Sequence, residues 1–85
     1  MNVLFKADGT KTPAPPQNGT DYELSELQGL VGGWIEVVNL QESGYILVVN
    51  EEGLLKGLPW NPAASAVAGM DIVGDAVLCP SDCLK

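Results

Sequence analysis

The chain has 85 residues, of which 46% are hydrophobic, so the sequence predicts one small globular domain spanning residues 1–85. Eleven aspartates and glutamates outnumber four lysines, and the sequence has no arginine or histidine, which gives a formal net charge of −7. Without a basic face, a nucleic-acid partner is not expected. Without an apolar run of about 18–20 residues, a membrane partner is not expected either. We therefore expect a soluble protein of the cytoplasm.

The chain begins with a predicted strand followed by a loop. Residues 2–7 (NVLFKA) are typical of a short strand, and Asp8-Gly9 is a turn signal after it. The Pro-rich segment 12–19 (TPAPPQNG) holds three prolines. Because proline lacks a backbone N–H, this segment cannot be a central strand, and we expect an extended surface loop.

A first helix is predicted after this loop. Thr20 and Glu23 have the spacing of a capping box, in which each side chain satisfies a backbone N–H at the helix start. The apolar residues that follow recur at helical spacing and form one stripe for the core: Leu24, Leu27, Leu30 and Val31. Gly32-Gly33 should end this helix.

A β-hairpin follows directly. Residues 34–40 (WIEVVNL) and 45–50 (YILVVN) are rich in β-branched and aromatic residues, which favour strands. Residues 41–44 should form the turn between them.

Two further strands complete the predicted sheet. Residues 54–58 (LLKGL) form a short one, and residues 71–78 (DIVGDAVL) form the last, interrupted at Gly74 by a bulge or a close backbone approach. With a second helix between them, the element order is β-α-β-β-β-α-β. The expected fold class is α+β, with a largely antiparallel sheet of about four or five strands and two short helices on one face.

The second helix has strong end signals. Asn61 is a preferred N-cap, Pro62 fits the first helical position and Gly69 can end the helix, so local structure alone accounts for these residues. The alternative is a ligand site, in which the amides at the helix start bind an anion, Trp60 stacks on a base and Lys56 supplies a positive charge. On that interpretation the candidate ligand-binding residues here are Lys56, Gly57, Trp60, Asn61, Ala63 and Ala64.

Two aromatic residues of the hairpin are further candidates. Trp34 and Tyr45 face each other in many hairpin registers, and cross-strand packing explains them. Alternatively, they add a stacking wall to a ligand site or anchor an interface.

No catalytic or metal-binding pattern is present in the sequence. Cys79 and Cys83 lie in an expected C-terminal tail, residues 79–85, as two free thiols with one buried at a strand end. Two thiols without histidine are too few for a metal site. The sequence offers no phosphate-binding loop and no nucleophile beside a base. We therefore expect neither an enzyme nor a bound metal or cofactor.

Three ordered blocks of the sequence resemble the DUF3846 family, small bacterial and phage domains of unknown function. The blocks are LQGLVGGWIEVVNL, LVVNEEGLLKGLPWNPAAS and IVGDAVL, and the resemblance covers about residues 24–78. The departures are Trp34, where the family usually has tyrosine, and Trp60, where it more often has a smaller apolar residue. The family has no assigned catalytic residues, so the resemblance transfers none. It implies a phage or mobile-element setting.

We therefore expect a non-enzymatic protein that inhibits a host anti-phage defence system by sequestering a nucleotide-derived signalling molecule. A core this small gains from oligomerisation, so we expect a homo-oligomer whose protomers share the pocket. The alternative is an acidic interaction module that directly blocks a host defence protein.

Overall fold

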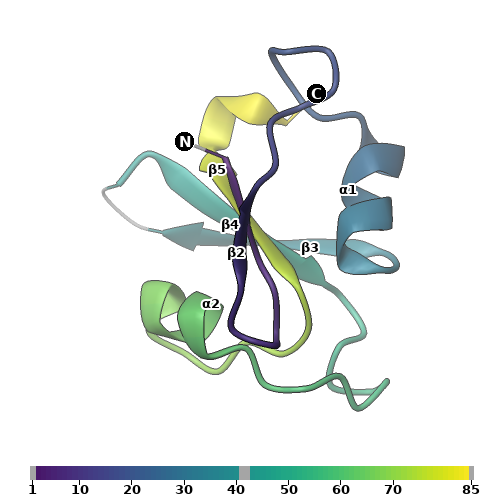
Figure 1. Cartoon of the computed structure of the whole chain (residues 1–85), viewed down its shortest axis with the longest axis vertical. Helices are drawn as coiled ribbons and strands as arrows, with labels where there is room; N and C mark the ends of the chain where they lie inside the picture. The colour runs from purple at the N-terminus through teal and green to yellow at the C-terminus, as the bar shows by residue number, and fades with distance from the viewer. Residues whose placement is uncertain (1, 41–42, 85) are drawn as a thin grey trace.

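The computed structural model describes residues 2–40 and 43–84, which form one sheet and two helices (Figure 1). In chain order the elements are β1 (Val3–Phe5), β2 (Lys11–Pro13), α1 (Leu24–Val31), β3 (Ile35–Leu40), β4 (Tyr45–Asn50), α2 (Pro62–Ala68), β5 (Ala76–Pro80) and a 3-10 turn, η1 (Ser81–Cys83). The predicted α+β class, an antiparallel sheet with two short helices, is confirmed.

The five strands follow the order β2-β1-β5-β4-β3, and every neighbouring pair is antiparallel. The predicted hairpin is formed by β3 and β4, with Leu40 opposite Tyr45 at its turn. Of the turn expected at 41–44, residues 41 and 42 lie outside the described residues, whereas Ser43 and Gly44 lie in a turn.

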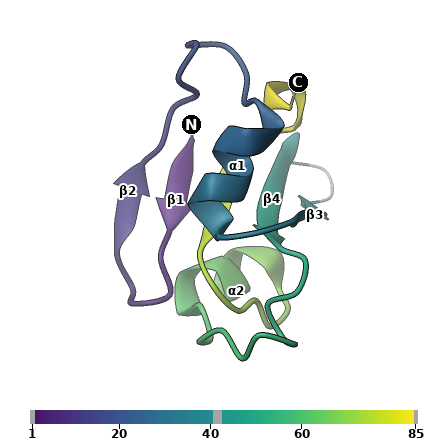
Figure 2. The same ribbon diagram turned by 90° about the vertical axis from the view of Figure 1, so that its right-hand side faces the viewer.

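The two faces of the sheet carry separate hydrophobic clusters. One cluster joins the sheet to α1 and includes Leu4, Leu27, Val31, Ile46, Val48, Val77 and Cys79. The other joins the sheet to α2 and includes Phe5, Leu47, Val49, Ala64, Ile72 and Ala76. The helices therefore lie on opposite sides of the sheet (Figures 1 and 2), which corrects the expectation that both lie on one face. The cause is the unbroken apolar run of β4, the pattern of a strand buried on both faces.

The Pro-rich segment supplies a strand that the sequence did not predict. β2 pairs with β1, with Phe5 opposite Lys11 and Val3 opposite Pro13. The expected loop at 12–19 is therefore wrong at its first two residues. β2 lies at the edge of the sheet, where a residue without an N–H is tolerated.

Residues 54–58 form no strand, contrary to expectation. A backbone hydrogen bond from the N–H of Leu58 to the carbonyl of Gly53 (3.0 Å) closes this segment into turns. Leu54 and Leu55 consequently point into solvent and are 84% and 87% exposed.

The last strand begins later than residue 71. The first half of the expected strand instead approaches the chain before α2, through a bridge between Trp60 and Val73. Gly74, with a left-handed φ of 78°, lies before β5 and does not interrupt it, because no strand forms on its N-terminal side. The close backbone approach predicted there is present, since the N–H of Gly74 donates to the Pro59 carbonyl (2.7 Å). The expected tail 79–85 is not separate from the fold. Residues 79–83 belong to β5 and η1, Leu84 forms a bridge with Tyr22, and Cys83 is buried.

The helix ends agree with the sequence except at the start of α1. There Glu23 is the N-cap and makes no side-chain cap hydrogen bond. The predicted capping box fails because Thr20 donates its hydroxyl to Asn18 Oδ1 (3.2 Å) within an Asx turn. Gly32 and Gly69 end the two helices in left-handed conformations. Neither helix in the described residues has the length and apolar character that a membrane crossing requires.

Candidate functional site

Asn61 is a buried structural residue at the start of α2. Its Nδ2 donates to the carbonyl oxygens of Phe5 (2.9 Å) and Gly74 (2.8 Å), and its Oδ1 accepts the N–H of Ala64 (3.0 Å). Asn61 and Ala64 are both 0% exposed. The interpretation of Asn61-Pro62 as a helix start is confirmed. The anion-binding alternative is wrong for these two residues, because their side-chain and amide donors already have buried partners.

Trp60 lies on the surface beside the helix start. Its side chain is 56% exposed and borders a shallow depression of about 390 Å³ together with Pro62, Ala66 and Met70. Neither Lys56 nor Gly57 lines this depression. Trp60 could stack on a planar ligand, but the predicted cationic partner does not lie at the same site.

Lys56, Gly57 and Ala63 have other roles in the structure. Lys56 Nζ lies 3.9 Å from Glu52 Oε1 in an exposed i,i+4 ion pair, which contributes little to stability. Gly57 takes a left-handed φ of 65° within the turn. Ala63 packs half-buried against the cluster under α2. The structure therefore does not gather the predicted residues of this segment into one site.

Trp34 and Tyr45 lie at opposite ends of the hairpin. Tyr45 is opposite Leu40, whereas the carbonyl of Trp34 accepts the N–H of Glu51 (2.8 Å) at the far end of the ladder. The expectation that the two rings face each other is wrong for this register. Trp34 is 62% exposed, and Tyr45 is half-buried.

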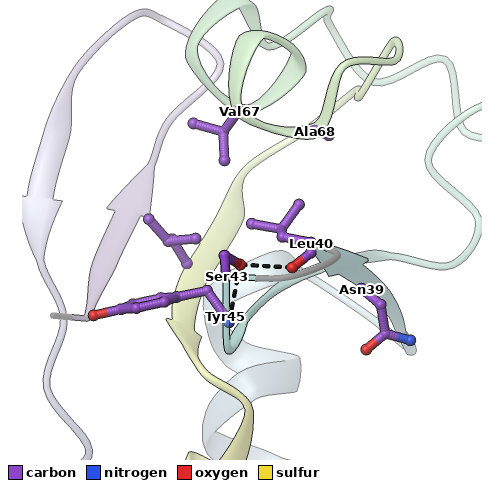
Figure 3. A pocket seen from close by; sticks show the side chains of 7 residues that line it. Asn39, Leu40, Ser43, Tyr45, Val67 and Ala68 are labelled. Atoms are coloured by element: carbon purple, nitrogen blue, oxygen red, sulfur yellow. Dashed lines mark hydrogen bonds between the residues drawn. The ribbon is translucent and has the colours of Figure 1, made fainter.

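Tyr45 instead lines a larger pocket between α2 and the end of the β3–β4 hairpin (Figure 3). The pocket has a volume of about 690 Å³, and its lining residues are Asn39, Leu40, Ser43, Tyr45, Val67, Ala68 and Leu78. It exists because α2 has only seven residues, a helix about 10 Å long. Gly69 ends α2 before the helix can cover this part of the sheet.

The pocket has an apolar floor and a polar rim. Leu40, Tyr45 and Leu78 come from three adjacent strands, and Val67 of α2 lies across from them. The Ser43 hydroxyl donates to the Leu40 carbonyl (2.6 Å) and accepts the Tyr45 N–H (3.1 Å), which fixes the rim (Figure 3). Among the lining residues that the structure describes, no side chain carries a charge at neutral pH, so this surface suits a planar or apolar group rather than an isolated phosphate.

Sequence reasoning named only Tyr45 among these lining residues. The sequence contains only weak indications that the other lining residues lie together. Alternation along the two hairpin strands puts Leu40 and Tyr45 on one face, and Ala64, Val67 and Ala68 follow i, i+3, i+4 spacing on α2. Whether they meet depends on which face of the sheet α2 covers, and no local sequence pattern specifies that face.

The side chains of Tyr22, Cys79 and Cys83 are buried in the hydrophobic cluster between the sheet and α1. Burial, and secondly the neighbouring Cys83, raises the pKa of the Cys79 thiol to about 11 from an ordinary 9.0, so Cys79 is protonated and a poor nucleophile at neutral pH. Burial also raises the pKa of Tyr22, whose hydroxyl donates to the Ala14 carbonyl. Within residues 2–40 and 43–84, no three His, Cys, Asp or Glu side chains gather into a possible metal site.

Comparison with known proteins gives one relationship. A family model described as a domain of unknown function, DUF3846, matches residues 1–83. No curated protein and no solved structure matches the chain. The matched residues run from before β1 to the end of η1, so they include the whole sheet and every residue that lines the pocket.

Proposed function

The chain belongs to the DUF3846 family, and we propose that this member is a non-enzymatic phage or mobile-element protein that sequesters a nucleotide-derived signalling molecule. By doing so it inhibits an anti-phage defence system in the host cytoplasm. The observation that carries the proposal is the pocket between α2 and the β3–β4 hairpin. Its volume of about 690 Å³ lies within the range of about 300–1,000 Å³ typical of small-molecule sites.

The chemistry of the pocket favours a ligand with a flat heterocycle. Tyr45 offers an aromatic ring, and Leu40 and Leu78 offer apolar surface beside it. Stacking of a base on an aromatic side chain contributes about 1–3 kcal/mol and needs no positive charge. Since no lysine of residues 2–40 and 43–84 lines the pocket, the phosphates of the ligand would remain at its open side. The best candidates are cyclic or ADP-ribose-type nucleotides that carry few phosphate charges.

The test is native mass spectrometry of the purified protein mixed with a panel of such nucleotides. We expect one nucleotide to be retained at fixed stoichiometry. Tyr45→Ala should weaken binding about 5- to 150-fold through lost stacking, and Val67→Arg should block the pocket. Leu55→Arg is the matched control, because Leu55 is 87% exposed and does not line this pocket. A wild-type protein that retains no nucleotide of the panel would contradict the proposal for those ligands.

Trp60→Ala separates the two candidate sites. Because Trp60 borders a different depression, this variant should retain the nucleotide as well as the wild type does. Loss of binding in Trp60→Ala, with binding kept in Tyr45→Ala, would move the site to the depression beside Trp60. Asn61→Ala does not test binding alone, because the loss of the buried hydrogen bonds of Asn61 would also destabilise the fold.

A second candidate function rests on a different surface. Leu54, Leu55 and Met70 are 84%, 87% and 56% exposed around a groove of about 370 Å³ whose lining includes Glu51 and Asp71. Exposed apolar side chains beside acidic ones fit an interaction module that blocks a host defence protein. This function predicts the opposite pattern of variants: Leu55→Arg would abolish inhibition of host defence in cells, whereas Tyr45→Ala would preserve it.

A further inference from the structure

The two edges of the sheet differ in how they are protected. β2 has three residues, among them Lys11 and Pro13, and a charged or N–H-lacking residue discourages pairing with another strand. β3 has six residues (IEVVNL), with no lysine and no proline, and in the described part of the chain its one strand neighbour is β4. β3 carries one charged residue, Glu36, but it has twice as many residues as β2, so it is the more open of the two edges.

The outward-facing backbone groups of β3 follow from its register. The carbonyl of Trp34 bonds to the N–H of Glu51 on the β4 side. In an antiparallel ladder the inward and outward residues alternate, so positions 36, 38 and 40 bond to β4. The N–H and C=O groups of Ile35, Val37 and Asn39 therefore point away from the sheet.

We propose that β3 pairs with β3 of a second copy of this chain, antiparallel and centred on Val37. This register places Ile35 opposite the partner's Asn39 and Val37 opposite the partner's Val37, and it satisfies about six outward backbone bonds. Moving the centre to Glu36 would place two carboxylates directly opposite each other, which is unfavourable. Centring the pairing on Val38 would leave fewer residues of the two β3 strands hydrogen-bonded to each other. Because β2 is protected, β3–β3 pairing closes as a two-fold dimer instead of extending into a fibre.

The dimer brings an aromatic side chain to the pocket. In the same register Trp34 lies opposite the partner's Leu40, and Leu40 lines the pocket. Alternation puts positions 34 and 40 on the same sheet face, and a two-fold axis perpendicular to the sheet keeps that face common to both copies. Each pocket therefore gains Trp34 from the other chain, which also explains why a tryptophan that is 62% exposed lies at this edge. The inference deepens the proposed function, but its test needs no ligand.

Cysteine cross-linking tests the register. In a hydrogen-bonded antiparallel pair, opposite Cα atoms lie about 5.5 Å apart, within the range that a disulfide spans. Val37→Cys should therefore give a cross-linked dimer under mild oxidation, seen on a non-reducing gel. The native thiols of Cys79 and Cys83 are buried. Leu55→Cys is the matched control, since it is more exposed than Val37 (87% against 37%) and lies outside β3. Equal cross-linking of the two variants would overturn the proposal.

Sedimentation velocity and tryptophan fluorescence test the interface without a cysteine. We expect a species of twice the 8.9 kDa chain mass, and its association should strengthen with salt because each chain carries −7. Val37→Lys should dissociate the dimer, whereas Leu55→Lys, with the same charge change, should not. In a Trp60→Phe background, Trp34 emission should shift to the blue on dimerisation. A wild-type monomer, or a dimer that survives Val37→Lys, would refute the interface.

The two proposals fail in different ways. A dimer that cross-links at position 37 but retains no nucleotide would contradict the ligand and leave the interface standing. A monomer that binds one nucleotide would contradict the interface and leave the sequestration proposal standing.

Discussion

Asn61→Ala should destabilise the fold by about 3–5 kcal/mol. The substitution removes three buried hydrogen bonds, to the carbonyls of Phe5 and Gly74 and from the N–H of Ala64. A buried backbone group left without a partner costs about 1–3 kcal/mol, and water entering the vacated space offsets part of the sum. A domain of this size has a free energy of unfolding of about 4–13 kcal/mol. The loss is therefore a large share of its stability, equivalent to about 15–30 °C in Tm.

Urea unfolding followed by circular dichroism measures this loss, and its matched control is Asn18→Ala. Asn18 Oδ1 also accepts two backbone N–H groups, from Thr20 and Asp21 (2.9 Å each), but its side chain is exposed. Because water can replace those bonds, the control should cost about 1 kcal/mol or less. If the two alanine variants unfold at the same urea concentration, burial of the hydrogen bonds does not account for the role of Asn61.

Three further predictions concern stability. Burial raises the pKa of Cys79 to about 11 from 9.0, so the folded protein favours the protonated thiol. The free energy of unfolding should therefore fall as the pH rises from about 9 to 11, and it should fall less in Cys79→Ala. Gly74→Ala should cost about 0.5–1.5 kcal/mol more than Gly69→Ala in urea unfolding. Both glycines have left-handed φ values, but only at Gly74 would the new Cβ lie 2.8 Å from Leu58 Cδ1, so the end of that side chain would have to move. Tyr22→Phe removes two part-buried hydrogen bonds of the hydroxyl, which donates to the Ala14 carbonyl and accepts from Asn2 Nδ2 (2.9 Å), and it should lower the same free energy by about 1–2 kcal/mol. An unchanged transition would mean that solvent replaces those bonds.

The elements predicted from the sequence are those with local signals. α2 has an N-cap, a proline at its first position and a terminal glycine within nine consecutive residues, Asn61 to Gly69. The hairpin strands carry dense β-branched residues. β2 has no such signal, since Lys11–Pro13 is polar and its strand conformation comes from pairing with β1. Residues 54–58 gave the opposite error, because an apolar composition does not by itself create a pairing partner.

The pocket depends on distances that no local pattern encodes. It requires α2 to lie on the face of the sheet opposite α1 and to end before the hairpin turn. The apolar run of β4 predicts burial on both faces, but it does not say which helix covers which face. Tyr45 was predicted as a candidate because it is aromatic, whereas Leu78 and Val67 join it only through the tertiary fold.

The position of β5 determines the order in which the protein can assemble. β1–β2 and β3–β4 are local hairpins that can close in microseconds, but each is marginal alone. β5 is the last strand along the described chain, yet it lies between β1 and β4, with Val3 opposite Leu78. A nascent chain without β5 therefore holds two hairpins with no strand between them, and joining them requires closure of a loop almost as long as the domain. The pocket can therefore form only after β5 has left the ribosome, and formation of the two hairpins is not sufficient for it.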